Sequence, residues 1–212
     1  MKKHLSIFLF VSIISVFLTA CSNSQHNAAE AVLSIYNLYI KEETSDVFKL
    51  GITEERALLT LSNYNDALIQ NLQNTMSSTG LIVEDTIIEE IILARKSALK
   101  TMLATCEITS IKDEKATVKL KTSYFDEATL NENAAKDAIK KAKKADASNQ
   151  KNLLESLSSY YAQNLIDAYL AITPSKEMKE LEITCILSGN TWIPEDMTSF
   201  GNELGLIISG QK

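Results

Sequence analysis

Residues 28–103 repeat their apolar positions with the period of an α-helix. Apolar side chains recur three and four residues apart, which places them on one face of each helix. Thr53 is a suitable N-cap, because its hydroxyl can accept a hydrogen bond from a backbone N–H of the first turn. Polar segments that contain Gly51 and Gly80 interrupt the pattern. The predicted helices cover residues 28–41, 53–76 and 84–103.

The apolar period changes to two near Thr105, which predicts β-strands. Lys112-Asp113-Glu114-Lys115 and Ser188-Gly189-Asn190 are typical of turns that join antiparallel strands. The sequence therefore predicts two hairpins. The first pairs residues 106–111 with 116–122, and the second pairs 181–187 with 191–193.

Helical periodicity returns between the two hairpins and after the second one. Asp126 and Ser148 are candidate N-caps of two helices between the hairpins, and Pro174 closes the later of these helices. A last helix begins near Asp196. This order favours an α+β fold with a single domain over residues 28–212, in which one small antiparallel sheet of two hairpins is covered by about six helices.

The first twenty residues have the pattern of a signal peptide. Lys2 and Lys3 precede the uncharged stretch Leu5–Leu18, which is shorter than the ~20 residues that span a bilayer. The stretch ends in Leu18-Thr19-Ala20-Cys21, which resembles a bacterial lipobox. We therefore expect residues 1–20 to be removed, Cys21 to be acylated (palmitate), and residues 21–27 to form a polar tether. The predicted partner is the membrane, contacted through the lipid on Cys21 at the extracytoplasmic face of the cell membrane.

Composition limits the chemistry of the chain. Removing the first twenty residues, whose only charges are Lys2 and Lys3, takes the net charge from −6 to −8. This acidic balance argues against a nucleic-acid partner. The remaining histidine, His26, lies in the tether, so the domain lacks the base of a Ser-His or Cys-His pair. With no Cys-x-x-Cys or Gly-rich phosphate loop either, we expect no metal site, no cofactor and no enzymatic activity.

Cys106 and Cys185 share the strand parity of their apolar neighbours, so both are expected to face the core. They can be two buried thiols that pack as small apolar side chains. Alternatively, they can form a disulfide across neighbouring strands, which an oxidising exterior permits. The sequence leaves both interpretations open.

Two acidic pairs follow strands and precede helices, where a carboxylate acid/base pair can lie. They are Asp126-Glu127 and Glu195-Asp196. The same positions suit N-caps, where negative charge meets the positive end of the helix dipole. Capping accounts for both residue types and both places.

A run of lysines on the predicted helix after Asp126 is a local basic cluster on an acidic chain. It can contact anionic head groups or wall polymers, but a charge run is usually a solvated helix face. The cluster consists of Lys136, Lys140, Lys141, Lys143 and Lys144.

Aromatic side chains from the strands and helices provide the candidate ligand-binding residues. Trp192, Tyr124 and Tyr161 can line a pocket between the sheet and the helices, together with Tyr160 and Tyr169. Their spacing fits core packing equally well.

Two segments resemble a family of cell-surface lipoproteins of Gram-positive bacteria that is known as a domain of unknown function (five-one-zero-five). The first is Ile35-Tyr36-Asn37-Leu38-Tyr39-Ile40-Lys41, and the second is Trp192-Ile193-Pro194-Glu195-Asp196-Met197 with a terminal Gly210-Gln211. The resemblance covers nearly all of residues 21–212 and implies extracellular anchoring. The family has no established activity, so it implies no functional residue.

These observations lead to two hypotheses. The first is a non-enzymatic, membrane-anchored module of the cell envelope that binds a ligand or a protein. The second is a carboxylate-dependent envelope hydrolase, which needs two acids about 5 to 9.5 Å apart in a cleft.

Overall fold

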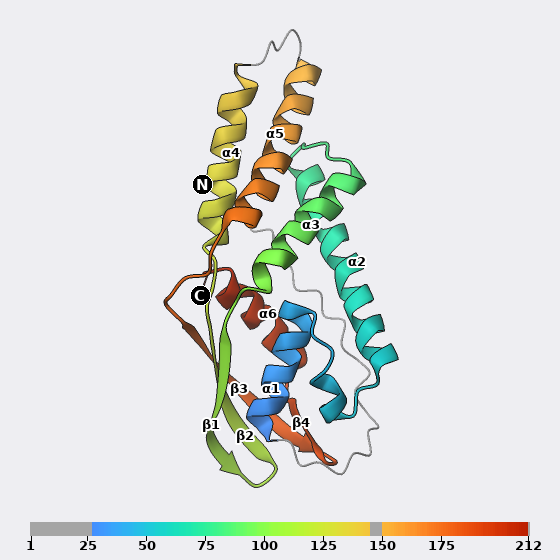
Figure 1. The fold of residues 1–212 in the computed structure, drawn as a ribbon, viewed down its shortest axis with the longest axis vertical. Helices are drawn as coiled ribbons and strands as arrows, with labels where there is room; N and C mark the ends of the chain where they lie inside the picture. Colours follow the sequence, from blue (N-terminus) through green and yellow to red (C-terminus); the bar gives the residue numbers. More distant parts are fainter. Residues whose placement is uncertain (1–26, 145–149, 212) are drawn as a thin grey trace.

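Four antiparallel strands form one sheet in the order β1-β2-β3-β4 (Figure 1). The computed structural model describes residues 27–144 and 150–211. The two predicted hairpins are joined because β2 and β3 pair along their whole length, with Val118 opposite Ile183 and Leu120 opposite Leu181. The strands are β1 (Ala104–Lys112), β2 (Lys115–Thr122), β3 (Lys179–Ser188) and β4 (Thr191–Pro194).

The two faces of the sheet differ as the alternating sequence predicts. One face carries buried apolar residues, whereas the other carries a ladder of opposite charges. On that polar face, Nζ of Lys121 lies 3.2 Å from Glu107 on β1 and 3.4 Å from Glu180 on β3. The sheet therefore buries one face and leaves the other in contact with water.

The described residues form six α-helices and two short helical turns. The helix predicted over residues 28–41 is an α-helix only to Tyr36 and continues as a π-helical turn to Lys41. The third helix ends at Leu99, so Leu103 lies outside it with 68% of its surface exposed. The elements are α1 (Ala28–Tyr36), the π-helical turn η1 (Asn37–Lys41), the 3₁₀ turn η2 (Val47–Leu50), α2 (Glu54–Ser78), α3 (Asp85–Leu99), α4 (Glu127–Ala142), α5 (Gln150–Ala171) and α6 (Met197–Ile208).

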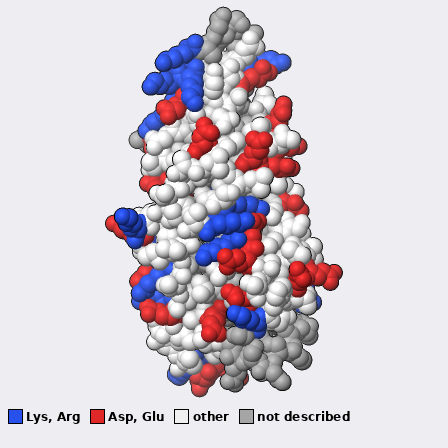
Figure 2. Space-filling model, in the orientation of Figure 1, with Lys and Arg blue, Asp and Glu red and all other residues white. Residues whose placement is uncertain are grey.

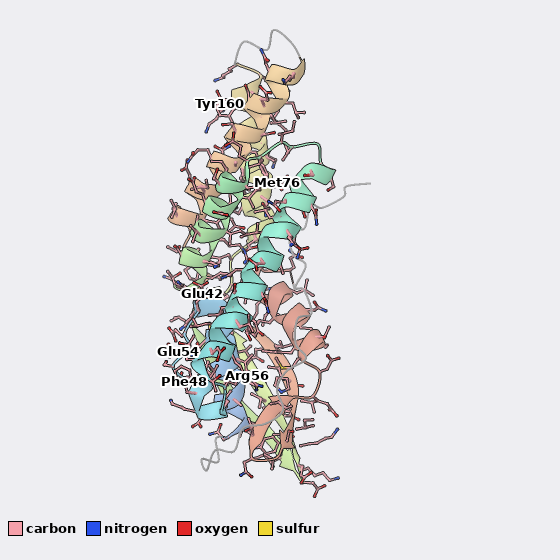
Figure 3. All side chains as sticks on the ribbon, turned by 90° about the vertical axis from the view of Figure 1, so that its right-hand side faces the viewer. Glu42, Phe48, Glu54, Arg56, Met76 and Tyr160 are labelled. Atoms are coloured by element: carbon pink, nitrogen blue, oxygen red, sulfur yellow. The ribbon has the colours of Figure 1, made fainter. Side chains whose placement is uncertain are left out.

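The helices divide into two groups along the long axis of the molecule (Figure 1). Helices α1 and α6 pack on the sheet, while α3, α4 and α5 pack against one another beyond its end. Helix α2 runs along one side of the molecule, with Glu54 and Arg56 in its first turn and Met76 in its last turn (Figure 3). The α+β fold with a single domain is confirmed, but only part of the helical layer covers the sheet.

One continuous cluster of buried residues connects the two groups of helices. It includes Val118 and Leu120 of the sheet, Leu204 of α6, and Leu165 of α5. The helical hairpin formed by α4 and α5 is therefore packed on the same core as the sheet and is not a separate unit.

Several expectations fall on residues outside the described ranges. The signal peptide over residues 1–20, the lipidated Cys21, the tether histidine His26 and the candidate cap Ser148 are among them. Within residues 27–144 and 150–211, no helix is both long and apolar enough to cross a bilayer.

Candidate functional site

A groove of about 720 Å³ runs between α4 and α5. Its lining positions repeat every three or four residues on both helices, so one face of each helix forms a wall. The segments that enter α4 and leave α5 close the end nearest the sheet. The described lining residues are Tyr124, Phe125, Asp126, Thr129, Leu130, Asn133, Ala134, Asp137, Asn164, Asp167, Ala168, Ala171, Ile172, Thr173 and Ser175.

The groove combines a buried apolar floor with an acidic rim. Leu130 and Ala134 are buried, whereas Asp126, Asp137 and Asp167 are exposed. None of the described residues that line the groove is a lysine or an arginine. The groove can therefore accept a positively charged group at its rim and apolar surface at its floor.

Side-chain hydrogen bonds fix the separation of the two walls. The Asn164 side chain donates to the carbonyl of Ala134 across 3.0 Å, and it accepts a hydrogen bond of 2.7 Å from Lys141. Deeper between the helices, the Tyr161 hydroxyl donates to Asn131 across 3.3 Å. The groove is thus formed by two helices that are held together and does not depend on a mobile loop.

The end of the groove nearest the sheet is held by backbone contacts from three elements. The N–H of Ser175 donates to the carbonyl of Tyr124 across 2.8 Å, and the N–H of Phe125 donates to the carbonyl of Ile208 across 3.0 Å. The Lys179 ammonium lies 4.9 Å from the centre of the Tyr124 ring, within cation–π range. These contacts fix Tyr124 where it lines the groove.

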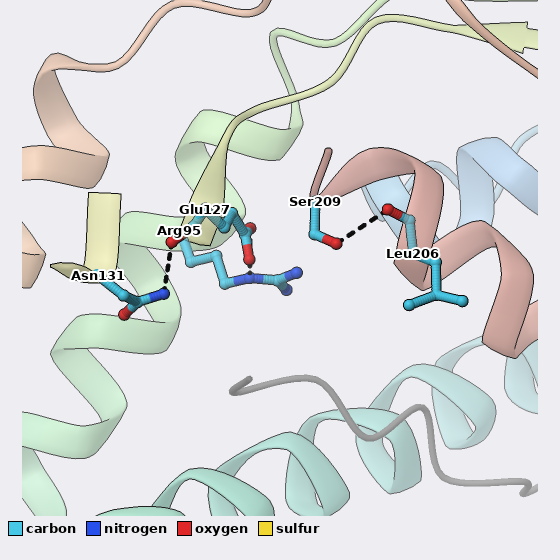
Figure 4. A network of polar contacts seen from close by, with 5 residues as sticks. All are labelled: Arg95, Glu127, Asn131, Leu206 and Ser209. Atoms are coloured by element: carbon cyan, nitrogen blue, oxygen red, sulfur yellow. Dashed lines mark hydrogen bonds and ion pairs between the residues drawn. The ribbon is translucent and has the colours of Figure 1, made fainter. Parts of the chain in front are cut away.

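A buried ion pair lies directly behind the start of α4. The Nε of Arg95 donates to Oε1 of Glu127 across 3.1 Å, and both side chains are almost fully buried (Figure 4). Asn131 extends this contact, because its side-chain amide donates to the carbonyl of Glu127 across 2.7 Å. Burial raises the pKa of Glu127 to about 7, although the Arg95 guanidinium opposes that shift. This network fixes the first turn of α4 on α3.

Sequence reasoning missed Arg95, although its position offered a signal. Arg95 follows Ile91 and Ile92 by four and three residues and precedes Leu99 by four, so it lies on the apolar stripe of α3. A charged residue on such a stripe needs a partner, because an unpaired buried charge is costly. The partner is Glu127, which the sequence pattern assigned to the helix dipole.

The structure does not bring the three aromatic candidates together. Tyr124 lines the groove, but Tyr161 is buried between the helices and hydrogen-bonded to Asn131. Trp192 lies on β4, half-buried and paired in register with Leu187. Tyr124 is therefore the only one of the three that lines this groove.

The two acidic pairs also lie in different places. Asp126 caps α4 by accepting from the N–H of Thr129 across 2.9 Å, and Asp196 caps α6 by accepting from the N–H of Ser199 across 2.9 Å. Both predicted N-caps are confirmed. Glu195 instead forms an ion pair of 2.6 Å with Lys115.

Asp196 and Glu195 line a second groove, of about 330 Å³, between β3 and α6. Asp126 lines the α4–α5 groove, so the two acidic segments do not form one site. Among the described residues, no three His, Cys, Asp or Glu side chains gather closely enough to hold a metal ion.

Cys106 and Cys185 are free thiols on β1 and β3. A disulfide across neighbouring strands was one of the two open interpretations, but β2 lies between the strands that carry the two cysteines. Cys185 is fully buried, and Cys106 is half-buried. Burial raises the pKa of each thiol to about 12, so both behave as apolar side chains in the core.

No family model and no curated protein matches this chain. Among solved structures, the fold is similar to the crystal structure of YcdA, a candidate lipoprotein from Bacillus subtilis, with a TM-score of 0.64 and 16% sequence identity. The match covers 85% of this chain and 55% of YcdA, so the chain spans about half the length of that protein. At this identity the likeness shows a shared fold. Membership of the family of unknown function stays a prediction.

Proposed function

We propose that this chain is a lipid-anchored module of the cell envelope that binds a ligand in the α4–α5 groove without transforming it. The basic and apolar pattern that ends in Cys21 supports the anchor. The shared fold with a candidate lipoprotein agrees with it. The module stands on the extracytoplasmic face of the membrane, held by acyl chains on Cys21.

The observation that carries the binding role is the composition of the groove. Its rim offers the carboxylates Asp126, Asp137 and Asp167, while its floor is apolar. A carboxylate rim favours an ammonium or guanidinium group, and the apolar floor favours a hydrocarbon body. The ligand class is therefore a cationic amphiphile, such as a short basic peptide or an organic amine.

Hydrolysis by carboxylates is the less favoured alternative. It requires one acid and one base in the same cleft. Asp126 and Asp196 each accept a hydrogen bond from the first turn of a helix, and they line different grooves. The α4–α5 groove itself contains Asp126, Asp137 and Asp167, but all three are exposed. Both carboxylate oxygens of Asp126 already accept hydrogen bonds from Thr129, so we favour binding.

The groove is tested by a thermal-shift screen of the Ser22–Lys212 form against lysine and arginine peptides, polyamines, anionic wall fragments and neutral metabolites. A ligand at a hundredfold its Kd adds about 2.7 kcal/mol, which raises Tm by roughly 5 to 11 °C in a domain of this size. We expect the cationic compounds to produce a shift that depends on the acidic rim of the groove. A shift that is confined to anionic or neutral compounds would contradict the assignment.

The matched variants locate the site. Asp137→Asn with Asp167→Asn removes two charges from the rim and should abolish the shift. Asp66→Asn with Glu90→Gln removes two exposed charges elsewhere and should preserve it. If both double variants lost the ligand-induced shift in Tm equally, net charge and not the groove would determine binding.

The anchor is tested separately in cells by labelling with a palmitate analogue. We expect the label on the wild-type chain and none on Cys21→Ser, which should also leave the membrane fraction. Unchanged labelling of Cys21→Ser would overturn the anchor but would leave the groove assignment intact.

A further inference from the structure

The outer end of α4 carries a stripe of lysines on its solvent face. We define the lysine stripe as Lys136 and Lys140 on α4 together with Lys143 and Lys144, which directly follow its last residue. Their spacings of three and four residues place them on one side of this end of the helix. All four are exposed, and Ile139 lies among them with 45% of its surface exposed. Figure 2 shows basic side chains gathered at this end of the molecule.

Among the described residues, only Lys136 of the lysine stripe has an acidic partner. Lys136 forms an ion pair of 2.7 Å with Glu132. Within the described ranges, Lys140, Lys143 and Lys144 make no ion pair, although the chain has 27 acidic residues against 21 basic ones. Like charges on successive turns repel one another and destabilise a helix. A bound polyanion would remove that repulsion.

The lysine stripe lies at the opposite end of the molecule from the start of α1 (Figure 1). Tyr36, at the end of α1, meets Thr122, at the end of β2, through a hydroxyl–hydroxyl contact of 2.8 Å. Helix α1 therefore begins toward the far end of the sheet, whereas α4 leaves the sheet just beyond Thr122. Its 16 residues extend about 24 Å further. The stripe is thus far from Ala28, where the tether enters the fold.

We propose that the lysine stripe is a docking surface for a phosphate-bearing polymer outside the membrane. The lysine ammonium is a compact point charge that binds phosphate. A polymer with closely spaced phosphates can contact several of these lysines at once, so its affinity exceeds that of a single phosphate. The choice of a polymer over lipid head groups rests on the proposed anchoring, which places the membrane at the other end of the domain.

The test measures binding of long-chain polyphosphate to the Ser22–Lys212 form, which retains every described helix and strand because the first of them begins at Ala28. Titrations at several salt concentrations compare the wild type with Lys140→Gln/Lys144→Gln. We expect the variant to bind at least tenfold more weakly at about 50 mM salt. The slope of log K against log salt should become shallower by about 1.5, because two phosphate contacts are lost.

The control is Lys112→Gln/Lys176→Gln, which removes the same charge from two exposed lysines elsewhere. Its affinity should stay within twofold of the wild type. Equal weakening in both variants would overturn the docking surface. The proposal would also be overturned if the wild type bound vesicles that contain anionic lipids but did not bind polyphosphate, and if Lys140→Gln/Lys144→Gln no longer bound those vesicles. If the wild-type chain takes up no palmitate label in cells but the Ser22–Lys212 form binds polyphosphate, the lipid anchor is contradicted and the docking surface stands.

Discussion

Glu42 Oε1 lies 2.7 Å from Nζ of Lys96, and its other carboxylate oxygen lies 2.8 Å from Nζ of Lys100. One carboxylate thus joins the residue after the π-helical turn to Lys96 in the last turn of α3 and to Lys100, the C-cap of α3. Glu42 does so from a left-handed backbone conformation, with φ of 58°. Such a backbone is unusual for a residue with a side chain.

Glu42→Gln should destabilise the protein at neutral pH but not in acid. Burial raises the pKa of Glu42, but hydrogen bonds from Lys100 and Lys96 outweigh burial and lower it overall. A carboxyl group with a lowered pKa in the folded state contributes stability above its unfolded pKa, and this contribution is lost as the pH falls through the folded pKa. We expect a loss of roughly 1 kcal/mol or less at pH 7, because the group is partly exposed.

Urea unfolding at pH 7 and pH 3 checks this expectation. Glu43→Gln is the matched control, because Glu43 is exposed and adjacent in the chain. The wild type and Glu42→Gln should differ in unfolding midpoint at pH 7, and the difference should be smaller at pH 3. If the unfolding midpoints of the wild type and Glu42→Gln differed by the same amount at both pH values, the loss of stability would come from packing and not from the charge of Glu42.

The Arg95–Glu127 pair should show strong non-additivity. Removing one partner leaves an uncompensated buried charge, which typically costs about 3 to 5 kcal/mol. Arg95→Met and Glu127→Gln should each lose stability in this range, whereas the double variant should lose much less than the sum. A double-mutant cycle of unfolding free energies checks this expectation. It is measured at pH 8, where Glu127 is ionised because its pKa is about 7. Additive losses would contradict a direct coupling between the two residues.

The sequence predicted the helix starts well because capping is local. An N-cap needs a suitable side chain and an N–H two or three residues later, both visible in a short segment. Thr53, Asp126 and Asp196 each accept the expected hydrogen bond in the structure. The strands were equally clear, because alternation of apolar and polar residues over a whole segment matches the period of a strand and not that of a helix.

The sequence could not predict how distant elements meet. Arg95 and Glu127 are 32 residues apart, and the acidic position of Glu127 was already accounted for locally as part of a helix start. The groove also depends on contacts between distant residues. Its walls come from α4 and α5, which are held together by hydrogen bonds from Asn164 to Ala134 and from Tyr161 to Asn131. Tyr124 was among the aromatic candidates, but its role in closing one end follows from the packing alone.

The two core thiols should react slowly in the folded protein. Burial raises the pKa of Cys106 and Cys185 to about 12, so little thiolate is present at pH 8. We expect iodoacetamide to modify Cys106 before Cys185, because Cys106 is half-buried and Cys185 is fully buried. Intact mass of the Ser22–Lys212 form gives the order of labelling, and unfolding in urea should make both react quickly. A mass two hydrogens lighter before labelling would instead reveal a disulfide.

Gly210 should tolerate alanine far less well than other glycines with the same backbone conformation. It follows the end of α6 with φ of 76°, where the N–H of Gln211 donates to the carbonyl of Leu206 and that of Gly210 donates to Ile207. This is the Schellman arrangement, which favours glycine. An added Cβ would also lie 2.9 Å from the carbonyl oxygen of Phe125.

Gly189→Ala and Gly80→Ala are the matched controls for that contact. Both glycines have positive φ, but an added Cβ at either one meets nothing within 4 Å. Their variants should lose about 1 kcal/mol from backbone strain, whereas Gly210→Ala should lose about 1 to 3 kcal/mol more, because the Phe125 carbonyl belongs to the backbone and cannot move aside freely. Urea unfolding compares the three variants.

Since Phe125 also lines the α4–α5 groove, Gly210→Ala should weaken binding of the groove ligand, whereas Gly189→Ala should not. Equal stability of all three variants would show that the end of α6 can shift away from the groove without cost.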